Sequence, residues 1–501
     1  MFAPRLPPRH ARSSFVLIDT RDTTLGRAVA ARASGRDGES GVHLLHDGKV
    51  AFAARAILAR TAERSLDVQY YIWHDDLSGS LLLDELHAAA DRKVRVRLLL
   101  DDNGIGGLDD RLAALDEHPS IEVRLFNPFV IRTPRALNWL LDFSRLNRRM
   151  HAKSLTADNQ ATIVGGRNVG DEYFGAKRDG LFADLDALCL GEVVGEVSRA
   201  FDRHWNSAAA TPVAAILKPV SPNRRRRLED TARRTAEGKR AGDYRAAIEA
   251  LPLFDDLSDA EVAFDWAPVR LLSDDPARAL GRDAPGDDLA DQLWPILSSA
   301  RGELCLVSGY FVPTSAGADE LVALARAGVR VRVLTNSYAA NDVGVVHAGY
   351  APLRHRLLAA GVELFEMPAP SDKPKTLSKF VRPGTGRGRQ MPGSTLHAKT
   401  FAVDAERLFV GSFNMDRRST NLNTELGIAV DSPRLAGELS RSFTEDIARN
   451  TYRLCLTDDG AVAWVDERDD KPMVERTEPG TNWASRALIR LLSRLPIRWL
   501  L

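Results

Sequence analysis

Apolar and polar positions follow two spacings along the first part of the chain, from about Gly41 onward. Leu66–Trp73 and Lys93–Leu100 are rich in β-branched, aromatic and aliphatic residues, so we expect strands there. Leu81–Ala90 between them has the three- and four-residue apolar spacing of a helix. A strand–helix–strand order of this kind predicts an α/β fold with a mostly parallel sheet covered by helices.

The same order returns later in the chain. Strands are expected at Glu303–Val312 and Val329–Leu334, with a helix over Ala318–Ala327. VQYYIW corresponds to VSGYFV, and AADRKVRVRLLLDD corresponds to ARAGVRVRVLTNS. The separation of the equivalent residues Val68 and Val307 is 307 − 68 = 239 residues. A repeat of this length predicts a duplicated α/β domain.

Chain length and composition suggest how these copies are divided into domains. With 501 residues the chain is too long for one hydrophobic core, so two core units are expected. The first stretch is rich in Arg, Pro, Ser and Gly, which is typical of a poorly ordered tail. We expect a flexible tail at 1–40, a first domain at 41–210, a charged linker or exposed helix at 211–260, a second domain at 261–455 and a C-terminal segment at 456–501.

The bulk composition is that of an ordinary globular protein. Lys+Arg and Asp+Glu are both 68, so the formal net charge is zero and no nucleic acid partner is expected. Cys189, Cys305 and Cys455 are isolated, which argues against a disulfide framework. No run of about 18 apolar residues is present, and the start lacks the apolar core of a signal peptide. Any membrane association is therefore expected to be peripheral.

Each copy contains the same group of polar residues and glycines. The spacing is His-x-Lys, four residues, Asp, six residues, and Gly-[Gly/Ser]-x-Asn. The matching sets are His151, Lys153, Asp158, Gly165, Gly166 and Asn168 in the first copy, and His397, Lys399, Asp404, Gly411, Ser412 and Asn414 in the second.

Residues two apart on a strand point to the same side, so His and Lys of each copy should face one cleft. Two such arrays suit phosphodiester exchange: one imidazole attacks phosphorus, the other protonates the leaving oxygen, and the lysines neutralise the phosphate. The glycines allow close approach of the backbone to a ligand, with Ser412, Asn168 and Asn414 as polar contacts. Lysine beside histidine repels cations, and we expect neither a metal nor another cofactor.

These motifs resemble the duplicated HKD motif of the phospholipase D superfamily. The resemblance implies two tandem α-β-α domains packed pseudo-symmetrically around one active site, and a phosphohistidine intermediate. It implies that the motif aspartates belong to the catalytic set, and that an acidic residue supports each histidine. Glu425 matches that position in the second copy; in the first, Asp184 is the choice and Asp186 the alternative. We take His151 as nucleophile and His397 as acid, with the exchanged roles left open.

A wider resemblance, over about residues 43–501, is to the bacterial cardiolipin synthase C group. LDVQYYIWHDDLSG, DFSRLNRRMHAKS and LTNSYAANDVGVVHAGY carry it. It implies transfer of a phosphatidyl group to phosphatidylglycerol, from phosphatidylethanolamine or a second phosphatidylglycerol. The alternatives are a hydrolytic phospholipase D and a phosphodiester nuclease. Asn341, Asp342 and His347 are candidates for acceptor binding, with a core or turn role as the alternative.

The last residues form a basic amphipathic pattern. Arg486, Arg490, Arg494 and Arg498 are spaced by four in ASRALIRLLSRLPIRWLL, and leucines occupy another face. The pattern predicts a helix in an anionic membrane interface, or one docked on the protein itself. The expected location is the cytoplasmic face of the bacterial inner membrane, with a small partner protein as a further expectation and no required oligomer. The basic loop 371–394 is expected to be a lid or an insertion.

Overall fold

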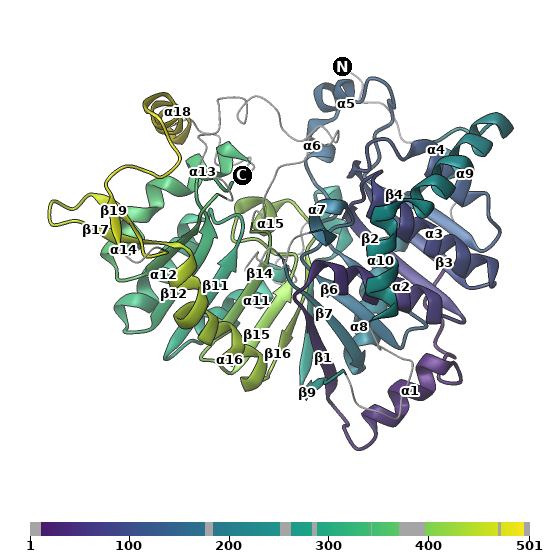
Figure 1. The fold of residues 1–501 in the computed structure, drawn as a ribbon, viewed down its shortest axis with the longest axis horizontal. Helices are drawn as coiled ribbons and strands as arrows, with labels where there is room; N and C mark the ends of the chain where they lie inside the picture. Colours follow the sequence, from purple (N-terminus) through teal and green to yellow (C-terminus); the bar gives the residue numbers. More distant parts are fainter. Residues whose placement is uncertain are drawn as a thin grey trace.

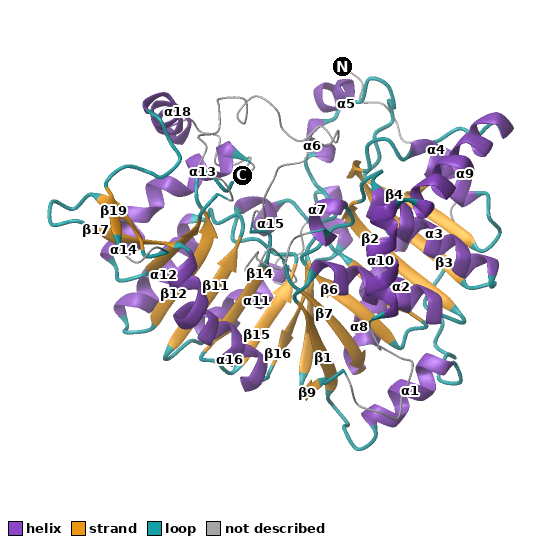
Figure 2. Cartoon of the chain, in the orientation of Figure 1, coloured by secondary structure: helices purple, strands orange, loops and turns teal. Residues whose placement is uncertain are grey.

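Two α/β halves lie side by side in this computed structural model (Figure 1, Figure 2). The structure describes residues 12–175, 184–250, 262–282, 288–341, 343–369, 396–468 and 472–494. The loop at 371–394, Asp342 and the last seven residues therefore lie outside the described residues.

The first half is built on a nine-stranded sheet in the order β8-β4-β3-β2-β5-β6-β7-β1-β9. Its strands are β1 Ser40–Leu45, β2 Ser65–Ile72, β3 Arg95–Gly104, β4 Ile121–Phe126, β5 Ser154–Ala157, β6 Ala161–Gly165, β7 Asp186–Gly191, β8 Ala210–Pro212 and β9 Asp265–Ala267.

The second half is built on a ten-stranded sheet in the order β10-β16-β15-β14-β11-β12-β13-β17-β18-β19. Its strands are β10 Val269–Ser273, β11 Glu303–Ser308, β12 Arg330–Asn336, β13 Glu363–Met367, β14 Lys399–Val403, β15 Arg407–Gly411, β16 Leu426–Val430, β17 Tyr452–Leu456, β18 Val462–Asp466 and β19 Met473–Glu475.

The two sheets share one internal order, which confirms the expected duplication. Strands β4-β3-β2-β5-β6-β7 correspond to β13-β12-β11-β14-β15-β16. The prediction of a mostly parallel sheet is wrong, because only three neighbouring strands in each copy pair in parallel, and the other pairings are antiparallel. After β4 the chain stays at the carboxyl end of the parallel strands. Strand β5 starts there, so it runs antiparallel to β2. A tight turn then joins β5 to β6, with positive φ at Asp158 and Asn159 (50° and 51°).

Apolar side chains form one core in each half and a third core between the halves. Leu66, Val68 and Leu98 belong to the first, and Leu306 and Val331 to the second. The shared core joins residues of both sheets and of the helices α8 and α16. The helices are α1 Thr24–Ala33, α2 Gly48–Thr61, α3 Leu77–Asp91, α4 Asp109–Asp116, α5 Ala136–Leu141, α6 Phe143–Leu146, α7 Asp171–Phe174, α8 Glu192–Asn206, α9 Pro222–Glu237, α10 Lys239–Glu249, α11 Leu289–Ser298, α12 Ser315–Arg326, α13 Gly344–Tyr350, α14 Arg354–Ala359, α15 Arg417–Asn421, α16 Pro433–Ser442, α17 Ala448–Asn450 and α18 Trp483–Arg494.

The expected flexible tail at 1–40 is corrected for residues 12–40, which pack on the first half. The backbone N–H of Val16 donates to Asp202 Oδ2 (2.9 Å), and the indole of Trp205 donates to Ser14 Oγ (2.9 Å). Helix α1 follows and buries Leu25 and Val29. These partners lie on α8, far away in sequence, and local composition carries no information about such contacts.

The expected domain boundaries also shift. Within the 211–260 linker α9 buries none of its residues, as an exposed helix should, but α10 packs Tyr244 against Phe52 of α2 (ring centroids 4.6 Å apart). Strand β9, assigned to the second domain, pairs with β1 of the first sheet. Strands β17 to β19 extend the second sheet past residue 455 to Glu475.

Helix α18 is docked by one face and exposed on another. Ile489 is buried against Tyr338 and Ala348, while Trp483 and Leu491 are 79% and 59% exposed. Within the described part of the chain, the helices are too short or too polar to cross a membrane.

Candidate active site

The two histidine segments lie at corresponding places, immediately before the strands β5 and β14. An isolated bridge between Met150 and Thr424 joins the halves there, and the backbone N–H of His151 donates to the Thr424 carbonyl (2.8 Å). The motif lysines begin or precede these strands, so His and Lys occupy the extended lead-in to the strand rather than its middle. One site is therefore shared by both halves, as the duplication predicted.

Each histidine is held by a carboxylate from the opposite half. Nδ1 of His151 lies 2.7 Å from Glu425 Oε2, and Nδ1 of His397 lies 2.6 Å from Asp184 Oδ2. Asp186, the alternative to Asp184, instead pairs with the buried Arg55 (2.8 Å). An ionised carboxylate only accepts hydrogen bonds, so Nδ1 carries the proton in both rings. This leaves Nε2 of each imidazole as the nitrogen available to a substrate.

The lysines are buried beside the histidines. Nζ of Lys153 donates to the His151 carbonyl, and Nζ of Lys399 donates to the His397 carbonyl. Both lysines are 1% exposed. Burial lowers the pKa of Lys153 to about 7. The charge of Glu425 raises this pKa, and the charge of Lys399 lowers it further. Lys399 also shifts the pKa of His151, so charges from both halves act on one site.

Burial sets the protonation of the histidines. It lowers the pKa of His151 to about 4, with Glu425 opposing this and Lys153 adding to it. Burial also lowers the pKa of His397, and Lys399 adds to the effect. Burial alone would raise the pKa of Glu425, but the His151 imidazole lowers it to about 2. Both rings are therefore neutral at pH 7 before substrate binds, beside ionised acids.

The glycine and serine that follow the second strand of each motif contact the supporting acids. Ser412 Oγ donates to Glu425 Oε2 (2.5 Å) and accepts from the Leu426 N–H (3.0 Å). At Gly166 an added Cβ would lie 2.1 Å from Asp184 Oδ1. The expected close approach of a glycine backbone is therefore made to the carboxylate that holds the other histidine. The first copy has no hydroxyl here because the carboxylate fills that space.

The two asparagines differ in their surroundings. Asn168 accepts from the Ile72 N–H and donates to the Tyr173 hydroxyl (both 3.2 Å), so it positions a ring that meets His397 edge-on at 5.3 Å. Asn414 Oδ1 is buried without a hydrogen-bond partner among the described residues. Sequence reasoning missed Tyr173 and also Tyr71, whose ring meets His151 edge-on at 4.9 Å.

The motif aspartates do not lie at this site, and their place in the catalytic set is corrected. Asp158 follows the far end of β5 and accepts from the backbone N–H groups of Glu63, Arg64 and Ser65 (2.8–2.9 Å). Asp404 receives the equivalent bonds from residues 301–303. A strand of four or five residues separates each aspartate from its histidine. Asp158 therefore holds the turn before β2, and Asp404 holds the turn before β11.

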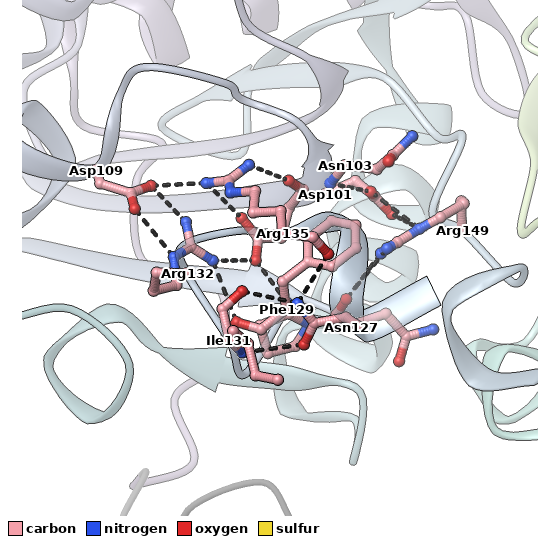
Figure 3. Close-up of polar contacts among 12 residues, drawn as sticks. Asp101, Asn103, Asp109, Asn127, Phe129, Ile131, Arg132, Arg135 and Arg149 are labelled. Carbon is pink, nitrogen blue, oxygen red and sulfur yellow. Dashed lines mark hydrogen bonds and ion pairs between the residues drawn. The ribbon is translucent and has the colours of Figure 1, made fainter. Parts of the chain in front are cut away.

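A second pair of equivalent residues positions the histidine segments, and sequence reasoning missed it. Asp101 Oδ2 accepts from the Met150 N–H (2.8 Å), and Asn336 Oδ1 accepts from the Leu396 N–H (3.1 Å). Asn336 is the last residue of β12, and Asp101 is the last residue of β3 that pairs with β4; their separation is 336 − 101 = 235 residues. Figure 3 shows Asp101 beside Arg149, whose guanidinium also donates to the Asn127 carbonyl (2.7 Å). The aligned repeats contained this signal as a polar residue after both apolar strands.

Two of the candidates for acceptor binding, His347 and Asn341, have structural roles. His347 is buried with Nε2 2.5 Å from Glu478 Oε1, and Arg354 donates to the same carboxylate (2.6 Å). Asn341 Oδ1 accepts from the Val343 N–H (3.0 Å), as a turn residue does. The core or turn interpretation therefore fits His347 and Asn341.

Two such sheets with a histidine–lysine pair at the corresponding edge of each define a phospholipase D-like protein. A family model described as "Cardiolipin synthase, PLD-like domain" matches residues 57–205 and 293–447. The chain belongs to this family, which confirms the resemblance seen in its motifs.

Individual relatives agree with this family. The chain is 45% identical over 477 residues to Cardiolipin synthase C of Escherichia coli (strain K12), covering 95% of this chain and 99% of that protein. It is 26% identical over 392 residues to a Cardiolipin synthase of Staphylococcus aureus (strain MW2), covering 78% and 63%. Phosphatidylserine synthase of Haemophilus influenzae Rd KW20 shares the fold, with a TM-score of 0.59 at 13% identity over 95% of this chain and 100% of that one.

Proposed function

We propose that this protein is a phosphatidyl transferase that makes cardiolipin from phosphatidylglycerol. The observation that carries the proposal is the pair of crossed contacts, His151 with Glu425 and His397 with Asp184, around two buried lysines. The membership in the cardiolipin synthase family and the 45% identical relative support the choice of product.

In the first step Nε2 of His151 attacks the phosphorus of the donor lipid. A P–N bond forms while the P–O bond to the donor's alcohol breaks, and His397 gives its proton to the leaving oxygen. His397 is neutral in the empty site, so the negative phosphate must raise its pKa on binding. Glu425 stabilises the positive charge that develops on the His151 ring.

In the second step the hydroxyl of phosphatidylglycerol replaces the donor's alcohol. His397 takes the hydroxyl proton, the oxygen attacks phosphorus, and the P–N bond breaks to release cardiolipin and neutral His151. Lys153 and Lys399 face the phosphate oxygens, whose charge spreads in both transition states. The exchanged assignment, with His397 as nucleophile, uses the same atoms in mirror order.

Membrane association is proposed to run through α18. Its exposed face carries Trp483, Arg490 and Leu491, and such a mixture of aromatic, basic and aliphatic side chains suits an anionic lipid interface. We place the protein peripherally on the cytoplasmic face of the bacterial inner membrane. Phospholipids are its substrates, and a small partner protein is a further candidate.

Product analysis tests the function. Purified protein and its His151→Ala variant are incubated in chelator with phosphatidylglycerol, with and without phosphatidylethanolamine, and the lipids are separated and weighed by mass spectrometry. Cardiolipin formed only with intact His151 is the expected result, and dependence on the second lipid names the donor. Phosphatidic acid in place of cardiolipin would make the protein a hydrolase. If the protein turned over no lipid but cleaved nucleic acid, it would be a nuclease.

A further inference from the structure

The connection between β4 and β5, which leads into the active site, exposes large apolar side chains. It contains α5 and α6, and it ends at the His151 segment. Leu137, Leu140 and Phe143 are 43%, 80% and 40% exposed. Leu137 and Leu140 are three residues apart on α5 and therefore share a face of that helix.

The opposite face of α5 is fixed to the protein. Asn138 is buried; its side chain accepts from the Ile131 N–H (2.9 Å) and donates to the carbonyls of Ile131 (2.7 Å) and Arg135 (2.9 Å). The Trp139 ring packs between Phe129 and Phe143, with centroids 5.9 and 6.0 Å away. Because these contacts determine the rotation of the helix, the two leucines are held outward.

An ionic clamp ties this connection to the end of β3. Arg132 and Arg135 both pair with Asp109 (Figure 3). Arg132 also pairs with the fully buried Asp102. Asp102 Oδ2 further accepts from the Phe129 N–H (2.7 Å). Asp102 directly follows Asp101, the residue that positions the His151 segment. The exposed apolar face is thus rigidly connected to the catalytic edge of the first half.

This face lies along the same edge of the molecule as α18. Figure 1 shows α5 and α6 at the top of the first half and α18 at the top of the second, with α1 at the opposite edge. The topology agrees, since α5 and α6 follow the carboxyl end of β4 while α18 packs on α13, which follows the carboxyl end of β12.

We propose that Leu137, Leu140 and Phe143 insert into the lipid surface, forming a second membrane contact across the active site from α18. The proposal rests on the phosphatidyl transferase function, because substrates of that enzyme lie in a membrane. Of the four Arg in residues 132–148, Arg132 and Arg135 pair with Asp102 and Asp109, and Arg145 pairs with Asp142. The exposed apolar side chains, rather than a net charge, therefore favour the lipid surface. A contact in each half turns the shared active-site edge towards the bilayer.

Two exposed aliphatic residues at opposite edges allow a matched test. Ile18 is 81% exposed, and it lies near Thr20, which bonds to Gln160 at the far end of β5 from His151. Leu140→Asp and Ile18→Asp therefore make the same chemical change at the two edges. Both side chains are largely exposed, so neither change should prevent folding.

Binding and chemistry are measured separately. Co-sedimentation with sucrose-loaded vesicles of phosphatidylglycerol and phosphatidylethanolamine gives the partition coefficient, and short-chain forms of both lipids below their micelle concentration give the intrinsic turnover. We expect Leu140→Asp to lower the partition coefficient about tenfold, as the loss of one buried leucine predicts. Its turnover of monomeric lipid should stay at the wild-type level, and Ile18→Asp should change neither quantity.

A fluorescent probe gives an independent readout of insertion. In a Cys455→Ser background, a polarity-sensitive dye on Leu140→Cys should shift to shorter wavelength with vesicles, while the dye on Ile18→Cys should not. Unchanged partition of Leu140→Asp and an unshifted dye would overturn the proposal. The proposal would also be overturned if light scattering showed that the wild type is a dimer and Leu140→Asp a monomer, with unchanged vesicle binding. That result would make this face a subunit interface. If the wild type did not turn over monomeric lipid at all, the proposed function itself would be refuted.

Discussion

Asp158 lies at the opposite end of β5 from His151, although both belong to one sequence motif. Its carboxylate is fully buried and accepts three backbone N–H bonds of 2.8–2.9 Å from residues 63–65. In Asp158→Ala these donors lose a charged acceptor, at roughly 1 kcal/mol or somewhat more for each, so the free energy of unfolding should fall by about 3–4 kcal/mol. The chemistry at His151 should be unaffected, because no catalytic group contacts Asp158 in the described part of the chain.

The equivalent residue of the second half is a built-in comparison. Asp404 makes the same kind of bonds, but it is only half-buried, and Arg301 and Gly302 beside it are exposed. Water can replace the carboxylate there, so Asp404→Ala should lower the free energy of unfolding by about 1–2 kcal/mol. The two variants thus differ in stability for a reason set by burial alone.

Urea unfolding followed by circular dichroism gives the stabilities, and turnover of short-chain lipid well below the unfolding transition gives the activity. Both variants should keep turnover within about threefold of wild type, since the capped turn is remote from the imidazoles. Asp158→Ala with wild-type stability and a loss of activity above about 100-fold would refute the structural role, because a loss of that size is typical of a missing acid–base group.

Three further predictions concern the site itself. Glu425→Gln should lower kcat by roughly 10²–10⁴, since it removes the charge that stabilises the His151 imidazolium; an active variant with an unchanged unfolding midpoint would contradict this. On monomeric lipid, kcat/KM should fall as pH rises, because His397, whose pKa burial lowers, must bind the proton that it gives to the leaving oxygen. A second fall is expected through the lowered pKa of about 7 of Lys153, which loses its charge. Constant kcat/KM up to pH 9 would contradict both roles. Gly166→Ser should impair turnover at unchanged vesicle binding, because its Cβ would lie 2.1 Å from Asp184 Oδ1 and displace the partner of His397; full activity would mean that Asp184 can move freely.

The sequence by itself determined the duplication and the membership of the site. Strand and helix spacing located β2, α3 and β3 and their counterparts within a few residues, because those patterns depend on local burial. The two motifs, in register with the repeat, identified His151 and His397. The family resemblance supplied Glu425 as a supporting acid and gave Asp184 as the choice over Asp186 for the other. The two motifs have the same internal spacing and lie 397 − 151 = 246 residues apart, so the sequence itself relates these two distant segments.

Only the tertiary structure decided which residues meet. The acids could serve histidines of their own half or of the other, and the packing of the halves around a shared core makes the contacts cross. Asp158 and Asp404 match the motif in spacing, yet each lies at the far end of the strand that follows its histidine, and these strands are four and five residues long. The order of residues 12–40 and the outward leucines of α5 likewise depend on contacts with distant elements. Periodicity reports which side of its own element a residue occupies, whereas the neighbours on that side are set by how the elements pack.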